Sequence, residues 1–136
     1  MTAHRSHHLG ARLASVAAIG FGVTTFVAGG AILAGEGAAR DAAGQYVSFV
    51  LWFNFLVGFA YVLAGVGLWA QRRWSVRLGL AIALATAAVF TAFGVHVFNG
   101  GVFEQRTVFA MGFRLLFWGF FSVVAWRDTS RRQEQV

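Results

Sequence analysis

Four long apolar stretches, joined by short connectors, constrain this chain more than any other feature. They cover residues 13–35, 47–70, 76–98 and 107–126. Each is at or near the ~20 residues that an α-helix needs to cross a hydrocarbon core of about 30 Å. Lipid offers no hydrogen bonds to the backbone, so a segment that crosses it alone must be helical. The sequence therefore predicts an all-α, polytopic membrane protein in which residues 1–136 form a single domain of four transmembrane helices.

The composition agrees with this prediction. Hydrophobic residues make up 58% of the chain and charged residues only 12%, whereas a soluble domain carries about 25% charged residues. So little polar surface cannot cover a water-soluble globule, and we expect the apolar excess to face lipid. The connectors, residues 36–46, 71–75 and 99–106, are short. Short connectors favour antiparallel packing of neighbouring helices into a bundle.

The distribution of arginine predicts the orientation in the membrane. All 11 basic residues are arginine, and eight of them flank the side that carries both termini and the second connector: Arg5, Arg12, Arg72, Arg73, Arg77, Arg127, Arg131 and Arg132. Only Arg40 and Arg106 flank the opposite side. Because arginine accumulates in cytoplasmic loops, we expect both termini in the cytoplasm (N-in/C-in) and a membrane of the bacterial inner, or cytoplasmic, type. The first apolar stretch is longer than the apolar part of a signal peptide, so we expect an uncleaved helix.

Several chemistries do not fit the residue types. The chain has no cysteine, which excludes disulfides, thiol catalysis, iron–sulfur clusters and cysteine-ligated structural zinc. Bis-histidine haem needs two facing histidines in the membrane, and only His96 lies in an apolar stretch. A short cluster of His4, His7 and His8 lies next to Arg5, so we expect no physiological metal site there. The arginines lie at helix ends rather than on one basic face, which does not fit nucleic-acid binding.

Helical periodicity predicts the inward face of each of the first three helices. Small residues let helix backbones approach closely in a membrane, and polar residues hydrogen-bond across the contact. The predicted faces are Ala18, Gly22, Thr25 and Gly29 on the first helix, Asn54, Gly58, Tyr61 and Gly65 on the second, and Ala81, Ala85, Ala88 and Ala92 on the third.

Arg114 is the most informative polar residue. It lies about seven residues into the predicted fourth helix, roughly 10 Å from the outer end of that helix. An ionised side chain within a span costs at least ~2.5–3.5 kcal/mol unless it snorkels or finds a partner. Two interpretations follow. The guanidinium either snorkels outward to carbonyls or lipid phosphates, or it is a buried cation paired with Glu104, Glu36 or a bound anionic ligand.

Polar residues near the outer ends of the helices predict one outward-facing pocket. His96 lies near the end of the third helix, where a neutral imidazole either bonds Asn99 or a carbonyl, or acts as a ligand or proton-handling group. Convergent polar groups in an apolar bundle are the default hypothesis for a binding site. The candidate ligand-binding residues are Asn54, His96, Asn99, Glu104, Arg106 and Arg114.

One stretch, near residues 54–101, carries a family resemblance. Its residues are Gly58, the run Gly65-Val66-Gly67-Leu68, the pair Arg77-Leu78 and the ending His96-Val97-Phe98-Asn99-Gly100-Gly101. This stretch, about a third of the chain, resembles the DoxX-type family of four-helix membrane proteins. Members of that family often carry an acidic residue early in the second helix, where this chain has Asn54. The resemblance implies a four-helix bundle that works beside a membrane redox system.

These observations favour a small accessory subunit of a membrane redox, respiratory or assembly complex, with no catalysis of its own. No GxSxG, HExxH or Walker pattern occurs in the sequence. Two alternatives stay open: a transporter or channel for an anion, a proton or another small solute, and an enzyme that acts on a lipid or a quinone. The sequence identifies no cofactor. A quinone is compatible with it, because quinone carbonyls could accept hydrogen bonds from His96 or Arg114. The expected partners are the lipid bilayer and either another membrane subunit or a second copy of the chain.

Overall fold

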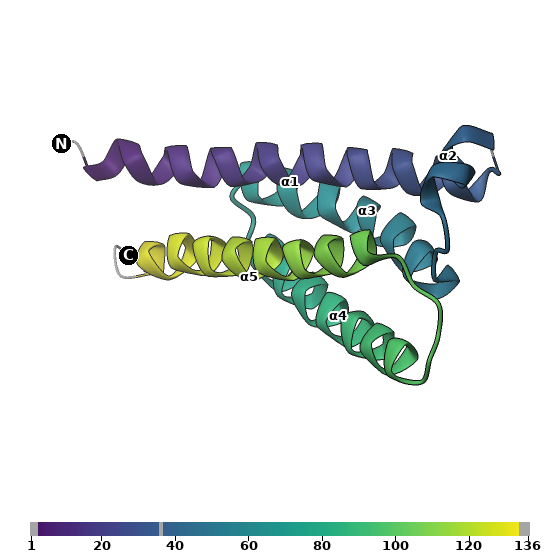
Figure 1. Ribbon diagram of the computed structural model, residues 1–136. Coiled ribbons are helices and arrows are strands. Elements are labelled where there is room, and N and C mark those ends of the chain that lie inside the picture. The colour runs from purple at the N-terminus through teal and green to yellow at the C-terminus, as the bar shows by residue number, and fades with distance from the viewer. Residues whose placement is uncertain (1–2, 36, 134–136) are drawn as a thin grey trace.

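The computed structural model describes residues 3–35 and 37–133, and these ranges are helical with short connections. The helices are α1 (Ala3–Leu33), α2 (Gly37–Ala43), α3 (Ser48–Trp69), α4 (Arg73–Phe98) and α5 (Gln105–Gln133). All but the short α2 are long and apolar enough to span a membrane. The start of α1 and the end of α5 lie at one end of the molecule, called here the terminal end, and α2 lies at the other, called here the α2 end (Figure 1). The chain therefore has the architecture of a multi-pass membrane protein.

The four apolar helices that the sequence predicts are confirmed, and the differences lie at their ends. α1 begins at Ala3 instead of residue 13, and α5 runs from Gln105 to Gln133 instead of from 107 to 126. The first connector also contains α2, which the sequence analysis did not predict. Apolarity marks the part of a helix that suits lipid, whereas backbone hydrogen bonds carry the same helix further, through polar residues, beyond the apolar span.

α1 and α3 pack against each other more extensively than any other pair of helices. A β-carbon on Gly22 would lie only 2.9 Å from the carbonyl oxygen of Gly58, and one on Gly65 would lie 2.9 Å from the carbonyl oxygen of Ser15. Real β-carbons essentially never come this close to a backbone atom. The contact therefore depends on glycine both at Gly22 and at Gly65. The predicted inward faces of the first two transmembrane helices are confirmed. Asn54, at the end of the second face, is half-buried.

The inward face predicted for the third transmembrane helix, α4, is wrong. Ala81, Ala88 and Ala92 are exposed and Ala85 is half-buried. The residues that α4 buries are instead Ser75, Gly79, Ile82, Thr86 and Phe93. Ring atoms of Phe121 lie 2.9 Å from the place of a β-carbon on Gly79, so this face accommodates large aromatic side chains of α5. A stripe of alanine marks a possible close contact, but it does not show that a neighbouring helix is present.

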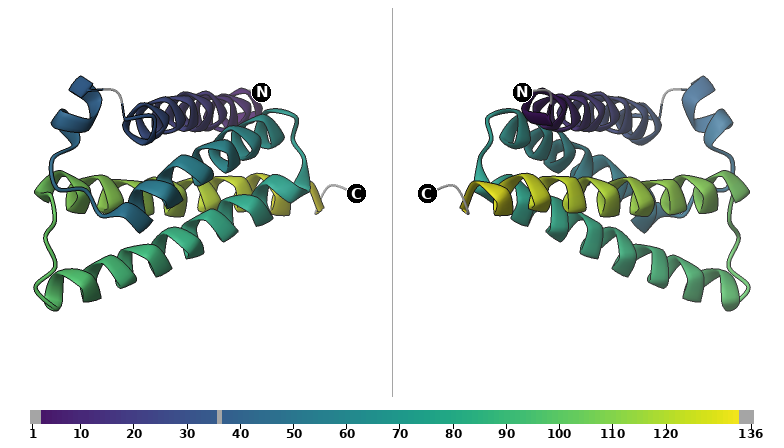
Figure 2. Two further views of the ribbon diagram at one scale, coloured as in Figure 1. Left: turned by 90° about the vertical axis from the view of Figure 1, so that its right-hand side faces the viewer. Right: turned by 90° about the vertical axis from the view of Figure 1, so that its left-hand side faces the viewer.

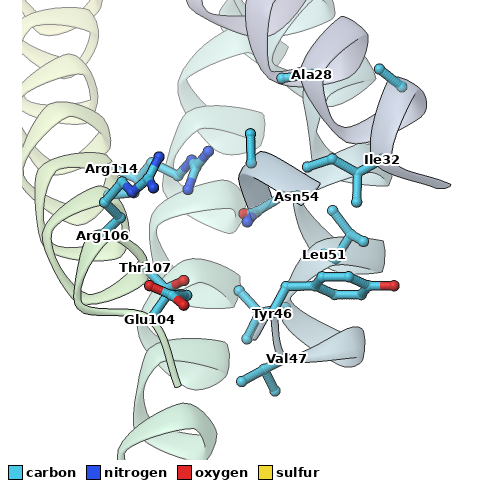
Figure 3. A pocket seen from close by; sticks show the side chains of 14 residues that line it. Ala28, Ile32, Tyr46, Val47, Leu51, Asn54, Glu104, Arg106, Thr107 and Arg114 are labelled. Atoms are coloured by element: carbon cyan, nitrogen blue, oxygen red, sulfur yellow. The ribbon is translucent and has the colours of Figure 1, made fainter. Parts of the chain in front are cut away.

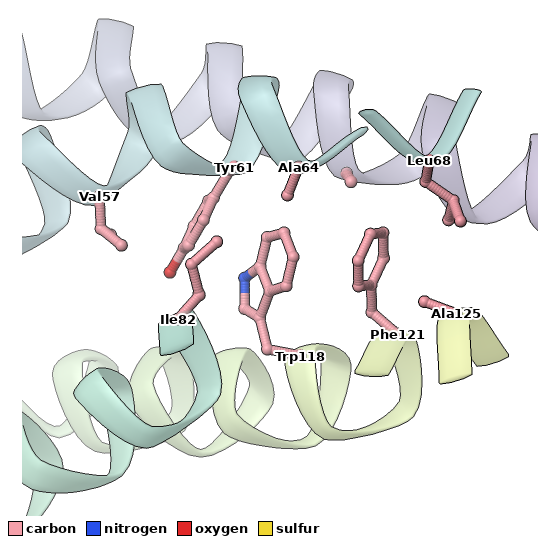
Figure 4. Close-up of a cluster of buried hydrophobic side chains, with 9 residues drawn as sticks. Val57, Tyr61, Ala64, Leu68, Ile82, Trp118, Phe121 and Ala125 are labelled. Carbon is pink, nitrogen blue, oxygen red and sulfur yellow. The ribbon is translucent and has the colours of Figure 1, made fainter. Parts of the chain in front are cut away.

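Aromatic side chains join α5 to the α1–α3 pair in the middle of the molecule (Figure 4). Tyr61 of α3 and Trp118 of α5 are fully buried, with ring centroids 4.6 Å apart. Phe121 packs on the other side of Trp118 at 4.8 Å. A smaller cluster of Val47, Val50, Phe93 and Met111 holds α3, α4 and α5 together nearer the α2 end. Aromatic pairs in such offset geometries contribute about 0.5–1.5 kcal/mol each beyond the area that they bury.

The glycine contact between α1 and α3 yields a matched pair of substitutions. Gly22→Ala would place a β-carbon against the backbone of α3, so we expect a loss of about 1–3 kcal/mol in unfolding free energy, as for other overpacked sites. Gly20 has no heavy atom within 4 Å of its β-carbon position, so Gly20→Ala serves as the control and should leave stability unchanged or slightly raised. Thermal unfolding of the purified protein in a mild detergent measures both. Equal melting temperatures for the two variants would contradict the close approach.

Candidate functional site

A cavity of about 500 Å³ opens at the α2 end, between the start of α5 and the α1–α3 pair (Figure 3). Its size falls within the roughly 300–1,000 Å³ that is typical of small-molecule sites. Ala28, Ala31 and Ile32 of α1 form one wall with the buried Val47, Val50 and Leu51 at the start of α3. The polar part comes mainly from α5 and the connector before it, with Glu104, Arg106, Thr107 and Arg114. The cavity thus has an apolar wall and a polar, charged wall.

Helical spacing explains why α5 supplies the polar wall. Arg106, Ala110 and Arg114 follow one another at intervals of four, so they lie on neighbouring positions of one face of α5. Because α5 begins at Gln105, Arg114 lies nine residues into the helix, roughly 13 Å along its axis. The helix gains only the polar residues Gln105 and Arg106 at its start, so Arg114 lies about seven residues, roughly 10 Å, inside the apolar stretch, as the sequence predicted.

Arg114 has an unusual environment for a cation. Its Cζ atom lies 5.7 Å from the centroid of the Phe21 ring, a distance that allows a cation–π interaction. Its Nε atom is buried and has no hydrogen-bond partner. No carboxylate of the described residues forms a salt bridge with it, and Glu36, one partner that the sequence suggested, lies outside those residues. Within residues 3–35 and 37–133, the protein therefore leaves this positive charge without an opposite one.

Glu104 lies at the rim of the cavity and holds two connectors together. Its Oε1 accepts a hydrogen bond of 3.2 Å from the backbone N–H of Gln45. Gly44 has a φ of 61°, and a β-carbon there would collide with the Glu104 carboxylate. Both facts require glycine at residue 44, because other residues rarely adopt this φ. The contact joins the segment before α3 to the segment before α5.

The structure brings together four of the six predicted site residues. Asn54, Glu104, Arg106 and Arg114 all line the cavity. His96 does not: it packs edge-on to Phe49, with ring centroids 6.2 Å apart, and lies directly against Gly101. Asn99 is the exposed C-cap of α4. The reason is the course of α4, which diverges from α1 toward the α2 end and carries its last turn to the far side of the bundle (Figure 2).

The polar groups beneath the cavity were not predicted from the sequence. The Tyr61 hydroxyl is buried beside Thr86 and Trp118 and lies within electrostatic reach of Arg114. Tyr61 was predicted to face inward, but its neighbours on α4 and α5 were not identified. Trp118 offered a signal, because tryptophan in membrane helices is enriched at the interfaces and this one lies near the middle of its span. It is fully buried, so it acts as a packing residue of the core.

No metal-ligand cluster of three or more His, Cys, Asp or Glu residues occurs in the part of the chain that the structure describes. The side chains of His4, His7 and His8 lie outside that part. No protein-family model, no curated protein and no solved structure matches this chain. The resemblance to the DoxX-type family therefore stays a prediction.

The rim contact can be tested by hydrogen exchange. Glu104→Ala removes the acceptor of the Gln45 amide, so we expect that amide to exchange about two- to tenfold faster, the effect of one ordinary hydrogen bond. Glu104→Gln keeps an acceptor oxygen in the same place and should exchange like the original protein. Hydrogen–deuterium exchange with peptide mass spectrometry reports on the segment that contains residues 44–47. No difference between the two variants would show that the contact does not order this segment.

Proposed function

We propose that this chain is a non-catalytic subunit of a membrane complex, and that its own contribution is to bind an anionic ligand in the cavity. One observation carries the proposal: Arg114 lies deep in the cavity wall without a carboxylate partner among the described residues. An unpaired charge within a membrane span is costly. A bound anion would compensate the positive charge of Arg114.

The charges of the cavity wall support an anion rather than a cation. The described lining contains two positive groups, Arg106 and Arg114, and one negative group, Glu104, which leaves a net charge of one positive unit. Arginine suits such a role because its planar guanidinium donates several hydrogen bonds in a fixed geometry and stays protonated. Thr107 and Asn54 add a hydroxyl and an amide on the same cavity.

The arginine distribution supports an antiparallel bundle with both termini in the cytoplasm. The first part of α1, the connection from α3 to α4 and the last part of α5 lie toward the terminal end of the molecule (Figure 1). These segments carry Arg12, Arg72, Arg73, Arg77 and Arg127. By the positive-inside rule, that end would face the cytoplasm of a bacterial-type cell, and the cavity would open on the outer side of the inner membrane. The ligand would then come from the outer leaflet or from the solution outside.

The chain has no cysteine, so single cysteines can test this orientation. Val102, in the connector between α4 and α5, is 65% exposed, and Ala70, in the connector between α3 and α4, is exposed too. We expect a membrane-impermeant maleimide to label Val102→Cys in intact cells and Ala70→Cys only after permeabilisation. The reverse pattern would place the cavity on the cytoplasmic side.

The packing below the cavity favours binding over transport. Tyr61, Trp118 and Phe121 are fully buried in the aromatic cluster between the cavity and the terminal end. A permeation pathway needs space and polar groups through the full depth of the membrane, and these rings fill that space. The cavity geometry therefore supports a site at which a ligand is held.

Removing the Arg114 charge should separate ligand binding from stability. We expect Arg114→Gln to lose an anionic adduct that the original protein retains in native mass spectrometry from an uncharged detergent. The same variant should raise the melting temperature of ligand-free protein, because it removes an uncompensated charge from the apolar interior. Arg127→Gln, at an exposed position of the same helix, is the control and should retain the adduct. Identical adducts in both variants would contradict the proposal.

A second observation supports association with a partner. The alanine stripe of α4 faces outward, and small residues are typical of close helix–helix contacts in membranes. We expect a membrane subunit, from a redox or assembly complex as the DoxX-type resemblance implies, to co-purify in stoichiometric amount from native membranes. Ala88→Phe should reduce its recovery, whereas Ala17→Phe, on the exposed side of α1, should not. Recovery of the chain alone would remove the support for a complex.

A further inference from the structure

We propose that the anion bound at Arg114 is the phosphate group of an anionic phospholipid, which enters the cavity sideways from the bilayer. This inference rests on the proposed function and names the ligand class of the same site. It follows from three properties of the cavity: where it opens, how its two walls differ, and which hydrogen-bonding groups line it.

The cavity has an opening within the membrane. Ala28 lines the cavity and is exposed. It lies five residues before the end of α1 at Leu33, roughly 7 Å along the helix axis, and therefore inside the apolar span Leu9–Leu33. α1 and α5 make only a slight contact with each other, and at this level the cavity lies between Ala28 of α1 and Ala110 and Arg114 of α5. The opening at Ala28 faces acyl chains.

The two walls match the two parts of an amphiphile. The wall from α1 and α3 is apolar, with Ala31, Ile32, Val50 and Leu51, and suits an acyl chain or a glycerol backbone. The facing wall carries the guanidinium groups of Arg106 and Arg114 (Figure 3). A small inorganic anion would occupy only the charged wall and would leave the apolar wall in contact with water, which is unfavourable.

The hydrogen-bonding groups suit a phosphate diester. A guanidinium donates two parallel hydrogen bonds to phosphate oxygens, and Arg106 and Arg114 both line the cavity. The net charge of one positive unit on the described lining matches the single negative charge of a phosphodiester. The Thr107 hydroxyl and the Asn54 amide lie on the same cavity and can donate to further oxygens.

Entry from the bilayer follows from the position of the opening. A lipid that slides in beside Ala28 brings its phosphate to Arg106 and Arg114 from the membrane side.

Chemical modification of Arg114 tests the inference. The purified protein in an uncharged maltoside detergent is treated with phenylglyoxal, which reacts with accessible guanidinium groups, and modification of Arg114 is followed by peptide mass spectrometry. We expect added phosphatidylglycerol to slow the reaction at Arg114 about tenfold, the effect of one charge-assisted hydrogen bond. Inorganic phosphate at the same concentration should leave the rate unchanged. Arg127, which is exposed at the terminal end, is the internal control.

A pair of variants tests the route of entry. Ala28→Trp fills the opening in the membrane without touching the charged wall, and we expect it to abolish the protection by phosphatidylglycerol. Ala17→Trp adds the same side chain at an exposed position of α1 that does not line the cavity, and it should keep the protection. Equal protection in both variants would overturn entry beside Ala28.

The outcomes separate this inference from the proposed function. Protection by inorganic phosphate without protection by phosphatidylglycerol would leave an anion site at Arg114 and overturn the lipid. Protection by neither would overturn both. Protection by phosphatidylglycerol alone, lost in Ala28→Trp and kept in Ala17→Trp, is the result that we expect.

Discussion

The close contact between α1 and α3 decides where the other elements lie. Inside a bilayer, lipid tails are as apolar as the helices, so association depends on close packing rather than on exclusion of water. Gly22, Gly58 and Gly65 permit that packing by bringing backbone against backbone. α5 packs against α4, and its aromatic side chains reach Phe21 of α1 and Tyr61 of α3. The cavity lies between the start of α5 and the α1–α3 pair.

The packing of α5 determines the environment of Arg114. Arg114 would be an ordinary snorkelling residue if it lay a turn or two nearer the end of α5, because its side chain could then reach the interface. At roughly 13 Å into the helix, it depends on Phe21 and on whatever occupies the cavity. Below it, Tyr61 and Trp118 close the interior. The charge therefore lies at the closed inner end of the cavity, an arrangement that favours holding a ligand.

The sequence predicts the parts of this structure that depend on one helix, and fails where two helices must be placed relative to each other. Apolar length located all four spans, and glycine spacing identified the contacting faces of α1 and α3. The alanine stripe of α4 followed the same rule and was wrong, because Gly79 and Ile82 receive the rings of α5 instead. Likewise, the predicted site residues on α3 and α5 do line one cavity, whereas His96 lies outside it. No local sequence pattern shows that α4 diverges from α1 toward the α2 end.

The length of α5 has a practical consequence for imaging. Its apolar span ends at Arg127, yet the same helix continues to Gln133, about 9 Å farther. A globular protein fused in helical register to this extension would be held in a fixed orientation by a continuous helix. Such a rigid marker would supply the asymmetric density needed to align electron micrographs and to see what occupies the cavity.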